Sequence, residues 1–277
     1  MRAAFPVIFV LGCLSVLLTE AQVSLPSFAG KDTLILCNIT CFDLKTKIPD
    51  LRSTADYQVV SIPYTPFPYV SNAPALTLPC ATNDDKFYDV FNLPFDFCFY
   101  GQVYNKITAS TNGVVSFDLS NALKCNGWNL LNSSGGIDTI PNAGAGGCVN
   151  NNNCSDPQDW AFYPRAAIFG VYYDLDIDQF SQNKKTEVRV EGIAPCRRFI
   201  LSFNEVPLYQ CNDLLTSHQI VFYESTGIID VYVKERPACR SWNDGRAIIG
   251  IQNWNRDKGV SPPGRNAAVW STSNDCL

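Results

Sequence analysis

The chain has 277 residues, of which 46% are hydrophobic and 12% aromatic, and its formal net charge is −5. A net negative chain lacks the positive footprint that nucleic-acid binding requires, and this hydrophobic content is too high for a disordered protein. The single histidine excludes sites that need several imidazoles, such as a three-histidine zinc site. The length suits one large β domain or two small ones.

Residues 1–21 have the pattern of a secretory signal peptide. A positively charged start is followed by an apolar run over residues 7–18 and by Ala21, a small residue suited to cleavage. The run is shorter than the roughly 20 residues that span a bilayer. A lipoprotein signal is the other alternative, because residues 10–13 resemble a lipobox, but the apolar run continues beyond them. We therefore expect a secreted or cell-surface protein whose mature chain does not insert into a membrane.

Cysteines are the second sign of export. Cleavage after Ala21 would remove one of the 12 cysteines, and an exported chain oxidises most of the rest to disulfides. The odd number that remains leaves one cysteine unpaired or paired outside the chain, and Cys276 is a candidate. No pair has a CxxC spacing or a nearby histidine, so we expect disulfides rather than zinc. Residues 22–54 form a separate N-terminal segment that carries cysteines.

We place the domain at residues 55–277. In its first half, apolar and polar residues alternate and do not follow a helical period. Residues 57–62 are the first predicted strand. Prolines then stud residues 63–79, which must be extended and cannot lie inside a sheet. Residues 95–104 are rich in aromatics, and we expect a bend at Gly101. The Asn112-Gly113 dipeptide, flanked by β formers, predicts a hairpin.

Residues 123–157 are rich in glycine and asparagine and form a long predicted loop, within which we expect Cys148 and Cys154 to pair. Alternation resumes after it. Further strands are predicted at residues 166–178, 186–191, 197–206, 217–224, 228–234, 246–253 and 266–271. This many alternating strands, separated by turn residues, indicates an all-β, disulfide-containing antiparallel β-sandwich.

Two of these strands also predict a disulfide. The hairpin formed by residues 217–224 and 228–234 turns near residue 225, and Cys211 and Cys239 lie equally far from that point. Opposite positions in an antiparallel pair have Cα atoms about 4.5–5.5 Å apart, which a disulfide can span. Cys196, which precedes a neighbouring strand, is the competing partner for either cysteine.

Three aspartates in one predicted strand could bind a cation. If the strand is regular, Asp174, Asp176 and Asp178 share one face at intervals of about 6.5–7 Å, and calcium prefers oxygen ligands of this kind. The segment begins like an EF-hand loop but lacks its glycine and glutamate. The simpler explanation is a solvent-facing strand whose charges prevent edge pairing. Residues 83–85 are a second acidic segment, typical of a turn. Apart from possible calcium, no cofactor is predicted.

An enzyme would need other features. The carboxylates of Asp174–Asp178 could serve a glycosidase, and the five tryptophans could stack on sugar rings. His218 is the only possible imidazole base, and no nucleophile elbow accompanies it. Tryptophans and alternating acids also occur in sandwiches without activity, so we predict no enzymatic function and no catalytic residues.

Several stretches carry a family resemblance. They are residues 61–64 (SIPY), 83–85 (NDD), 93–101 (LPFDFCFYG), 110–117 (STNGVVSF), 170–176 (GVYYDLD), 194–199 (APCRRF), 217–224 (SHQIVFYE), 248–252 (IIGIQ) and 263–266 (PGRN). Together they resemble the N-terminal extracellular module of large Bacteroidetes surface proteins that end in a gliding-motility-associated C-terminal sorting domain. The STNG…SF element and the later acidic strand also resemble the nidogen-like domain of extracellular matrix proteins.

The resemblance covers about residues 55–271 and implies export, surface display and a structural or adhesive role without catalysis. We therefore expect a jelly-roll-like or nidogen-like sandwich that acts as a non-catalytic adhesion or structural module at the cell surface. Its partner would be an unidentified extracellular protein or polysaccharide. The alternatives are a carbohydrate-binding module and a hydrolase that uses the Asp174–Asp178 carboxylates.

Overall fold

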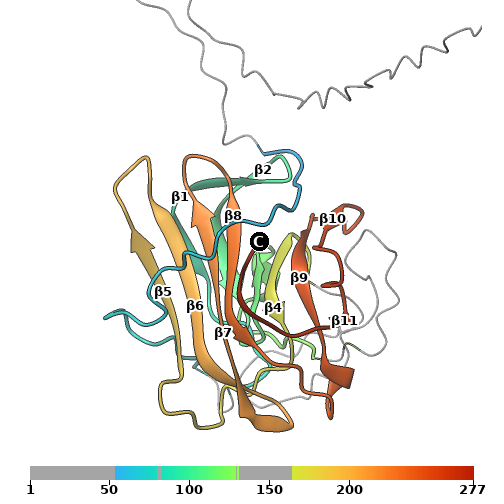
Figure 1. Ribbon diagram of the computed structural model, residues 1–277. Helices are drawn as coiled ribbons and strands as arrows, with labels where there is room; N and C mark the ends of the chain where they lie inside the picture. Colours follow the sequence, from blue (N-terminus) through green and yellow to red (C-terminus); the bar gives the residue numbers. More distant parts are fainter. Residues whose placement is uncertain (1–53, 80–82, 129, 131–163) are drawn as a thin grey trace, which may run out of the picture. The chain divides into compact units, whose positions relative to one another are not determined.

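The computed structural model describes residues 54–79, 83–128, 130 and 164–277, and the regular secondary structure of these residues is almost entirely β-strand (Figure 1). The chain divides into two units, residues 1–50 and 51–277, and the described residues belong to the second. The predicted signal peptide and the Cys148–Cys154 pair lie outside them. No helix in the described part is long and apolar enough to cross a membrane.

The first of two antiparallel sheets has seven strands, in the order β1-β2-β3-β4-β9-β10, with β11 paired to β9. Its strands are β1 (Phe91–Phe99), β2 (Gln102–Ala109), β3 (Val114–Ser116), β4 (Ala167–Tyr172), β9 (Arg246–Gln252), β10 (Gly259–Val260) and β11 (Ala268–Val269). Strands β4 and β9 pair although about 80 residues separate them, with Ile168 opposite Ile251.

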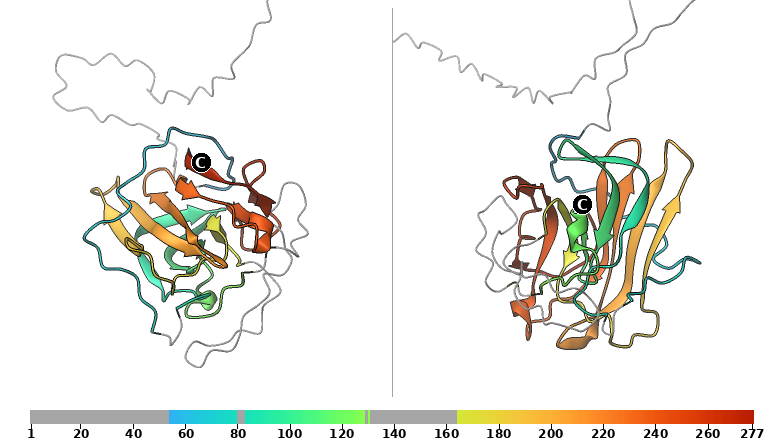
Figure 2. Two further views of the ribbon diagram at one scale, coloured as in Figure 1. Left: turned by 60° about the horizontal axis from the view of Figure 1, so that its bottom comes forward. Right: turned by 180° about the vertical axis from the view of Figure 1, so that it is seen from behind.

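The second sheet has five strands in the order β12-β8-β7-β6-β5. They are β12 (Thr272–Cys276), β8 (Ile229–Arg236), β7 (Cys211–Tyr223), β6 (Arg198–Leu208) and β5 (Lys185–Glu191). Two short 3-10 turns, η1 (Leu119–Asn121) and η2 (Asn243–Gly245), complete the regular structure of the described residues. The two sheets form the two layers visible in Figure 2, so the predicted antiparallel sandwich is confirmed.

The core lies between the two sheets. The ring of Phe97 on β1 stacks at 5.0 Å on that of Phe222 on β7, across the two layers. Alternation along β8 places Val231 and Val233 in this core, whereas Tyr232 between them belongs to a smaller cluster on the other face. Each fully buried large apolar side chain contributes about 1.5–3 kcal/mol of transfer free energy, so the sandwich is held chiefly by this core.

The predicted hairpin at Asn112-Gly113 is confirmed: β2 and β3 pair through Thr108 opposite Ser116 and Ala109 opposite Val115. Gly113 has φ +78°, and a Cβ added there would lie 2.5 Å from the carbonyl oxygen of Val171. Only glycine fits this turn, because both the dihedral angle and the close backbone exclude a side chain.

Three strand predictions are corrected by the structure. Residues 57–62 form no strand, and Ile62 makes only a long hydrogen bond of 3.4 Å to the carbonyl of Cys276. The strand predicted over residues 166–178 ends at Tyr172. The one predicted over residues 266–271 is reduced to β11, and β12 follows it, although Thr272–Cys276 has the composition of a turn. Its pairing with β8 outweighs that local preference.

The proline-rich segment, residues 63–79, lies across the outer face of the second sheet, where Figure 1 shows it in blue crossing the strands. Tyr64 and Phe67 pack over the outer cluster that includes Val221 and Tyr232. Gln219 on β7 donates hydrogen bonds of 3.1 Å to the carbonyls of Phe67 and Pro68. The prediction of an extended segment outside the sheets thus agrees with the structure.

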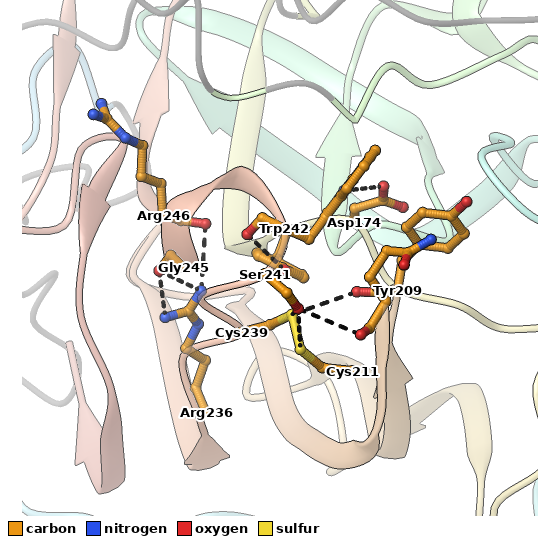
Figure 3. Close-up of a disulfide and its surroundings, with 11 residues drawn as sticks. Asp174, Tyr209, Cys211, Arg236, Cys239, Ser241, Trp242, Gly245 and Arg246 are labelled. Atoms are coloured by element: carbon orange, nitrogen blue, oxygen red, sulfur yellow. Dashed lines mark hydrogen bonds between the residues drawn. A yellow bond between two sulfur atoms is a disulfide. The ribbon is translucent and has the colours of Figure 1, made fainter.

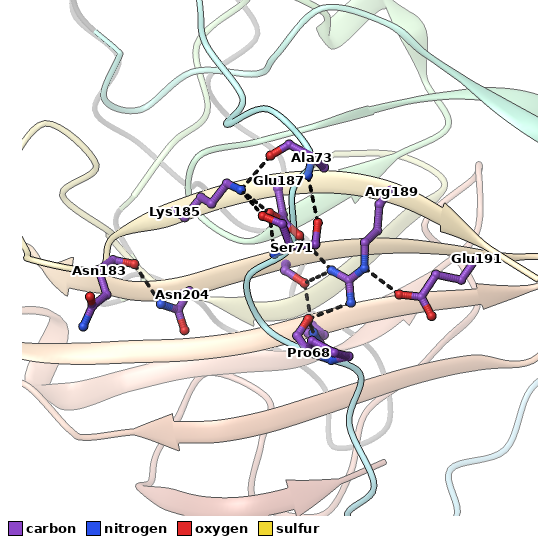
Figure 4. Close-up of polar contacts among 11 residues, drawn as sticks. Pro68, Ser71, Ala73, Asn183, Lys185, Glu187, Arg189, Glu191 and Asn204 are labelled. Atoms are coloured by element: carbon purple, nitrogen blue, oxygen red, sulfur yellow. Dashed lines mark hydrogen bonds and ion pairs between the residues drawn. The ribbon is translucent and has the colours of Figure 1, made fainter.

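Ion pairs fasten this segment to the edge strand β5 (Figure 4). Glu187 is fully buried and pairs with Lys185 at 2.6 Å and with Arg189 at 2.9 Å. Lys185 in turn donates to the carbonyls of Ser71 and Ala73, and Arg189 donates to that of Pro68. Leu76 completes the contact with a 2.7 Å backbone bond to Thr186. The edge of β5 is therefore covered, which protects it from pairing with another chain.

Candidate functional site

The three aspartates singled out in the sequence do not share one exposed face. The chain leaves the sheet after Tyr172 and turns at residues 177–178. Asp174 and Asp176 are 2% and 7% exposed, whereas Asp178 is exposed. The interpretation of a solvent-facing, charge-protected strand is therefore wrong, because this segment folds back into the end of the sandwich.

Asp174 is held by a tryptophan from a distant loop (Figure 3). Its Oδ2 accepts a 2.6 Å hydrogen bond from the indole Nε1 of Trp242. Its Oδ1 is buried and has no hydrogen-bond partner among the described residues. Burial, with the neighbouring charges of Asp85 and Asp84, raises the pKa of Asp174 to about 9, so this carboxyl is protonated at neutral pH.

Residues 83–85 contribute further carboxyls to the same region. Asp85 accepts a 2.7 Å bond from the side-chain amide of Asn112, whose oxygen accepts a 2.9 Å bond from the backbone of Leu175. Burial raises the pKa of Asp85 to about 6, and burial together with the charge of Asp85 raises the pKa of Asp84 to about 8. We call Asp84, Asp85, Asp174 and Asp176 the acidic cluster. The sequence showed both segments but not that they meet.

The acidic cluster is not arranged as a metal centre in the described part of the chain, where no three His, Cys, Asp or Glu side chains are grouped to hold an ion. Asp176 instead accepts a hydrogen bond from the backbone of Gln179, and Asp178 accepts two from Asn83. Calcium binding by Asp174, Asp176 and Asp178 stays a prediction. In the structure, the carboxyl groups of these three aspartates accept hydrogen bonds from residues in loops.

His218 faces the interior. It is fully buried, its ring stacks on Phe203 at 4.5 Å, and neither ring nitrogen has a hydrogen-bond partner among the described residues. Burial lowers its pKa to about 3. The ring is neutral and closed to solvent at physiological pH, so it cannot serve as a base toward an external substrate.

The disulfide expected between Cys211 and Cys239 is present, with Cα atoms 5.9 Å apart (Figure 3). It joins the start of β7 to the loop after β8, at the end of the hairpin remote from its turn. The competing partner Cys196 is unpaired and exposed, and Cys276 is unpaired and buried. Cys125 is disulfide-bonded as well.

The tryptophans do not form a shared sugar-binding surface in the described residues. The indole nitrogen of Trp242 is bonded to Asp174, and that of buried Trp270 donates to the carbonyl of Ala247. Trp254 is 42% exposed. One exposed ring can pack on a sugar, whereas Trp270 is buried in the core and the half-buried Trp242 is bonded to Asp174.

A cavity of about 540 Å³ opens at one edge of the sandwich, and sequence reasoning missed it. Residues 54–62 cover it, β8 supplies one wall and β9 and β10 supply the other. Its lining is mainly aliphatic and includes Ile62, Ile229, Val231, Ile249, Ile251 and Val260. Two of the exposed large apolar side chains, Val60 (54%) and Ile228 (51%), also lie at this cavity. The alternation of apolar and polar residues over 57–62, which predicts a strand, is the sequence feature that points to this apolar surface.

In the comparison with known proteins, the chain matches one family model. A family model described as NIDO related matches residues 56–275, which is nearly the whole of the described sandwich. No curated protein and no solved structure matches the chain.

Proposed function

The chain belongs to the NIDO-related family, and we propose on this basis that it is an extracellular adhesion module that binds a protein or polysaccharide without chemical turnover. The nidogen-like resemblance seen in the sequence is confirmed by the family match. Nidogen-like domains are extracellular and generally non-catalytic. That the module lies within a gliding-motility-associated Bacteroidetes surface protein is part of the proposal.

The observation that carries the proposal is the match of one extracellular family to nearly the whole sandwich. The Cys211–Cys239 disulfide supports it, because such bonds persist in oxidising compartments.

The hydrolase alternative is less well supported by the geometry. A glycosidase needs two carboxyls that flank a substrate in an accessible cleft. Asp174 and Asp176 are buried, and Asp178 is bonded to Asn83 in a surface turn. The lone imidazole is buried as well.

Binding of the mature chain, beginning at Gln22, to immobilised matrix proteins and polysaccharides tests the proposal. We expect saturable binding to at least one of them and no turnover of it, while heat-unfolded protein serves as the control. Release of product from a polysaccharide, or the absence of saturable binding across both classes, would contradict adhesion. Variant Trp254→Ala then separates the carbohydrate-binding alternative, because it removes the exposed ring without touching the core.

A further inference from the structure

The cavity at the edge of the sandwich carries an inference beyond adhesion. Its volume, about 540 Å³, lies within the range of small-molecule pockets, about 300–1,000 Å³. The pocket opens to solvent, since exposed Val60 and Ile228 are among the residues that line it.

The lining determines what the space can hold. Ile229 and Val231 come from the second sheet, and Ile249 and Ile251 come from the first. Burying the apolar surface of a ligand against such aliphatic walls removes that surface from water, which is favourable. Apolar material is therefore favoured inside.

Charge at the cavity limits the ligand further. No lysine, arginine or histidine is among its lining residues, which include two acids, Asp56 and Asp230. Asp56 pairs with Lys258 at 3.1 Å, and Asp230 accepts hydrogen bonds from Tyr223 and Tyr232 at 2.7 and 3.0 Å. An anionic head group would meet these carboxylates with no cation in the lining to bind it, so carboxylate and phosphate head groups are disfavoured.

We propose that this cavity binds an uncharged, mainly aliphatic molecule whose hydrocarbon part lies between β8 and β9. The volume accommodates roughly 15–20 heavy atoms, taking about 30 Å³ for each water-sized group. Thr54 and Gln58, which also line the cavity, offer neutral hydrogen-bonding groups to a hydroxyl head. Val60 and Ile228 form the apolar mouth.

Fluorescence titration of the mature chain with phenylnaphthylamine, an uncharged apolar fluorophore, tests the proposal. We expect saturable enhancement of emission that dodecanol reverses, whereas laurate, which has the same chain with a carboxylate head, competes at least about tenfold more weakly. No saturable signal, or no displacement by dodecanol, would overturn the proposal. Equal competition by laurate would overturn the requirement for an uncharged ligand.

Variants locate the site. Val60→Asp and Ile228→Asp place a charge at the mouth, and because both residues are about half exposed the fold should tolerate them. We expect each to weaken fluorophore binding by about tenfold, an effect of about 1.4 kcal/mol. Val103→Asp on β2, a 66% exposed valine outside the cavity lining, is the matched control. Equal loss in the control, or none in the mouth variants, would place the fluorophore elsewhere and contradict the assignment.

Discussion

The indole of Trp242 donates a 2.6 Å hydrogen bond to the buried carboxyl of Asp174, and so joins the loop after β8 to the segment after β4. The backbone carbonyl of Asp174 also accepts a 3.0 Å bond from Tyr209. Three loops thus meet at Asp174, a residue that is 2% exposed. A carboxylate there would lack solvation, so the neutral acid is the stable form.

The acidic cluster should make the protein less stable in alkali. The folded-state pKa of Asp174 is raised to about 9 and that of Asp84 to about 8. The folded chain therefore keeps protons that the unfolded chain has released. This contribution is complete below pH 4 and is lost as pH rises toward 9, by at most about 1.4 kcal/mol per pH unit for Asp174.

Thermal unfolding between pH 6 and pH 9.5 measures this effect. We expect the melting temperature of the wild type to fall across the range and that of Asp174→Asn to fall less, because the amide carries no charge to desolvate. The variant Asp213→Asn, at an exposed position on β7 outside the cluster, serves as control. Identical pH dependence in Asp174→Asn and wild type would show that Asp174 is not protonated in the folded protein over this pH range.

Millimolar calcium tests the metal prediction made from the sequence. A bound cation would neutralise the carboxylates and raise the melting temperature at pH 8, and the shift would be absent in Asp176→Asn. No shift in melting temperature at millimolar calcium would contradict the metal prediction. The acidic cluster would then be neutralised by protonation.

Removal of the Cys211–Cys239 disulfide should destabilise the sandwich. The bond closes a loop with a sequence separation of 28 residues, and in the chain-entropy model such a loop contributes roughly 3–4 kcal/mol. Denaturant unfolding of the double variant Cys211→Ser, Cys239→Ser gives the difference. The unpaired, exposed Cys196→Ser should match the wild type, and a similar loss in both would assign the effect to thiol chemistry instead.

Arg236 should be essential to the C-terminal part of the fold. It is fully buried and donates to the carbonyls of Gly245 and Arg246 (Figure 3). It also donates to the carbonyl of Trp270, and its Cζ lies 4.6 Å from the centroid of the Trp270 ring. Burial lowers its pKa to about 10, so it remains charged at neutral pH.

Arg236→Met would leave these carbonyls without their donor, at a cost of about 2–4 kcal/mol in unfolding free energy. The exposed Arg240→Met should cost less than about 0.5 kcal/mol. Equal stability of the two variants in urea would show that backbone capping by Arg236 is not significant.

Glu187→Gln should loosen the proline-rich segment. Burial alone would raise the pKa of Glu187, but the hydrogen bonds from Lys185 and Ser71 and the charge of Lys185 outweigh it and lower the pKa overall. Glu187 is therefore ionised in the folded protein. Its replacement by glutamine removes the ion pairs that hold Lys185 and Arg189 against the proline-rich segment. We expect amide exchange in residues 71–76 to become at least about tenfold faster, with Glu235→Gln, on exposed β8 surface, unchanged. Unaltered exchange would contradict a fastening role for the ion pairs.

The structural features that the sequence by itself determined are either local or symmetric about a turn. Alternation predicted the sandwich, Asn112-Gly113 predicted a hairpin, and the equal distances of Cys211 and Cys239 from residue 225 predicted the disulfide. These features survive because a strand pair and its turn are encoded within a few tens of residues, where side-chain period and turn chemistry act directly.

The tertiary structure alone decided which polar groups are buried and where the sandwich is open. Asp174 meets Trp242 and Asp85 across 68 and 89 positions of the chain, and Thr272–Cys276 becomes a strand because β8 needs a partner at its edge. The cavity arises from residues 54–62, β8 and β9, which lie together although nearly 200 residues separate the first from the last. Contacts of this kind leave no period in the sequence, because each depends on how two distant segments pack and not on the residues beside them.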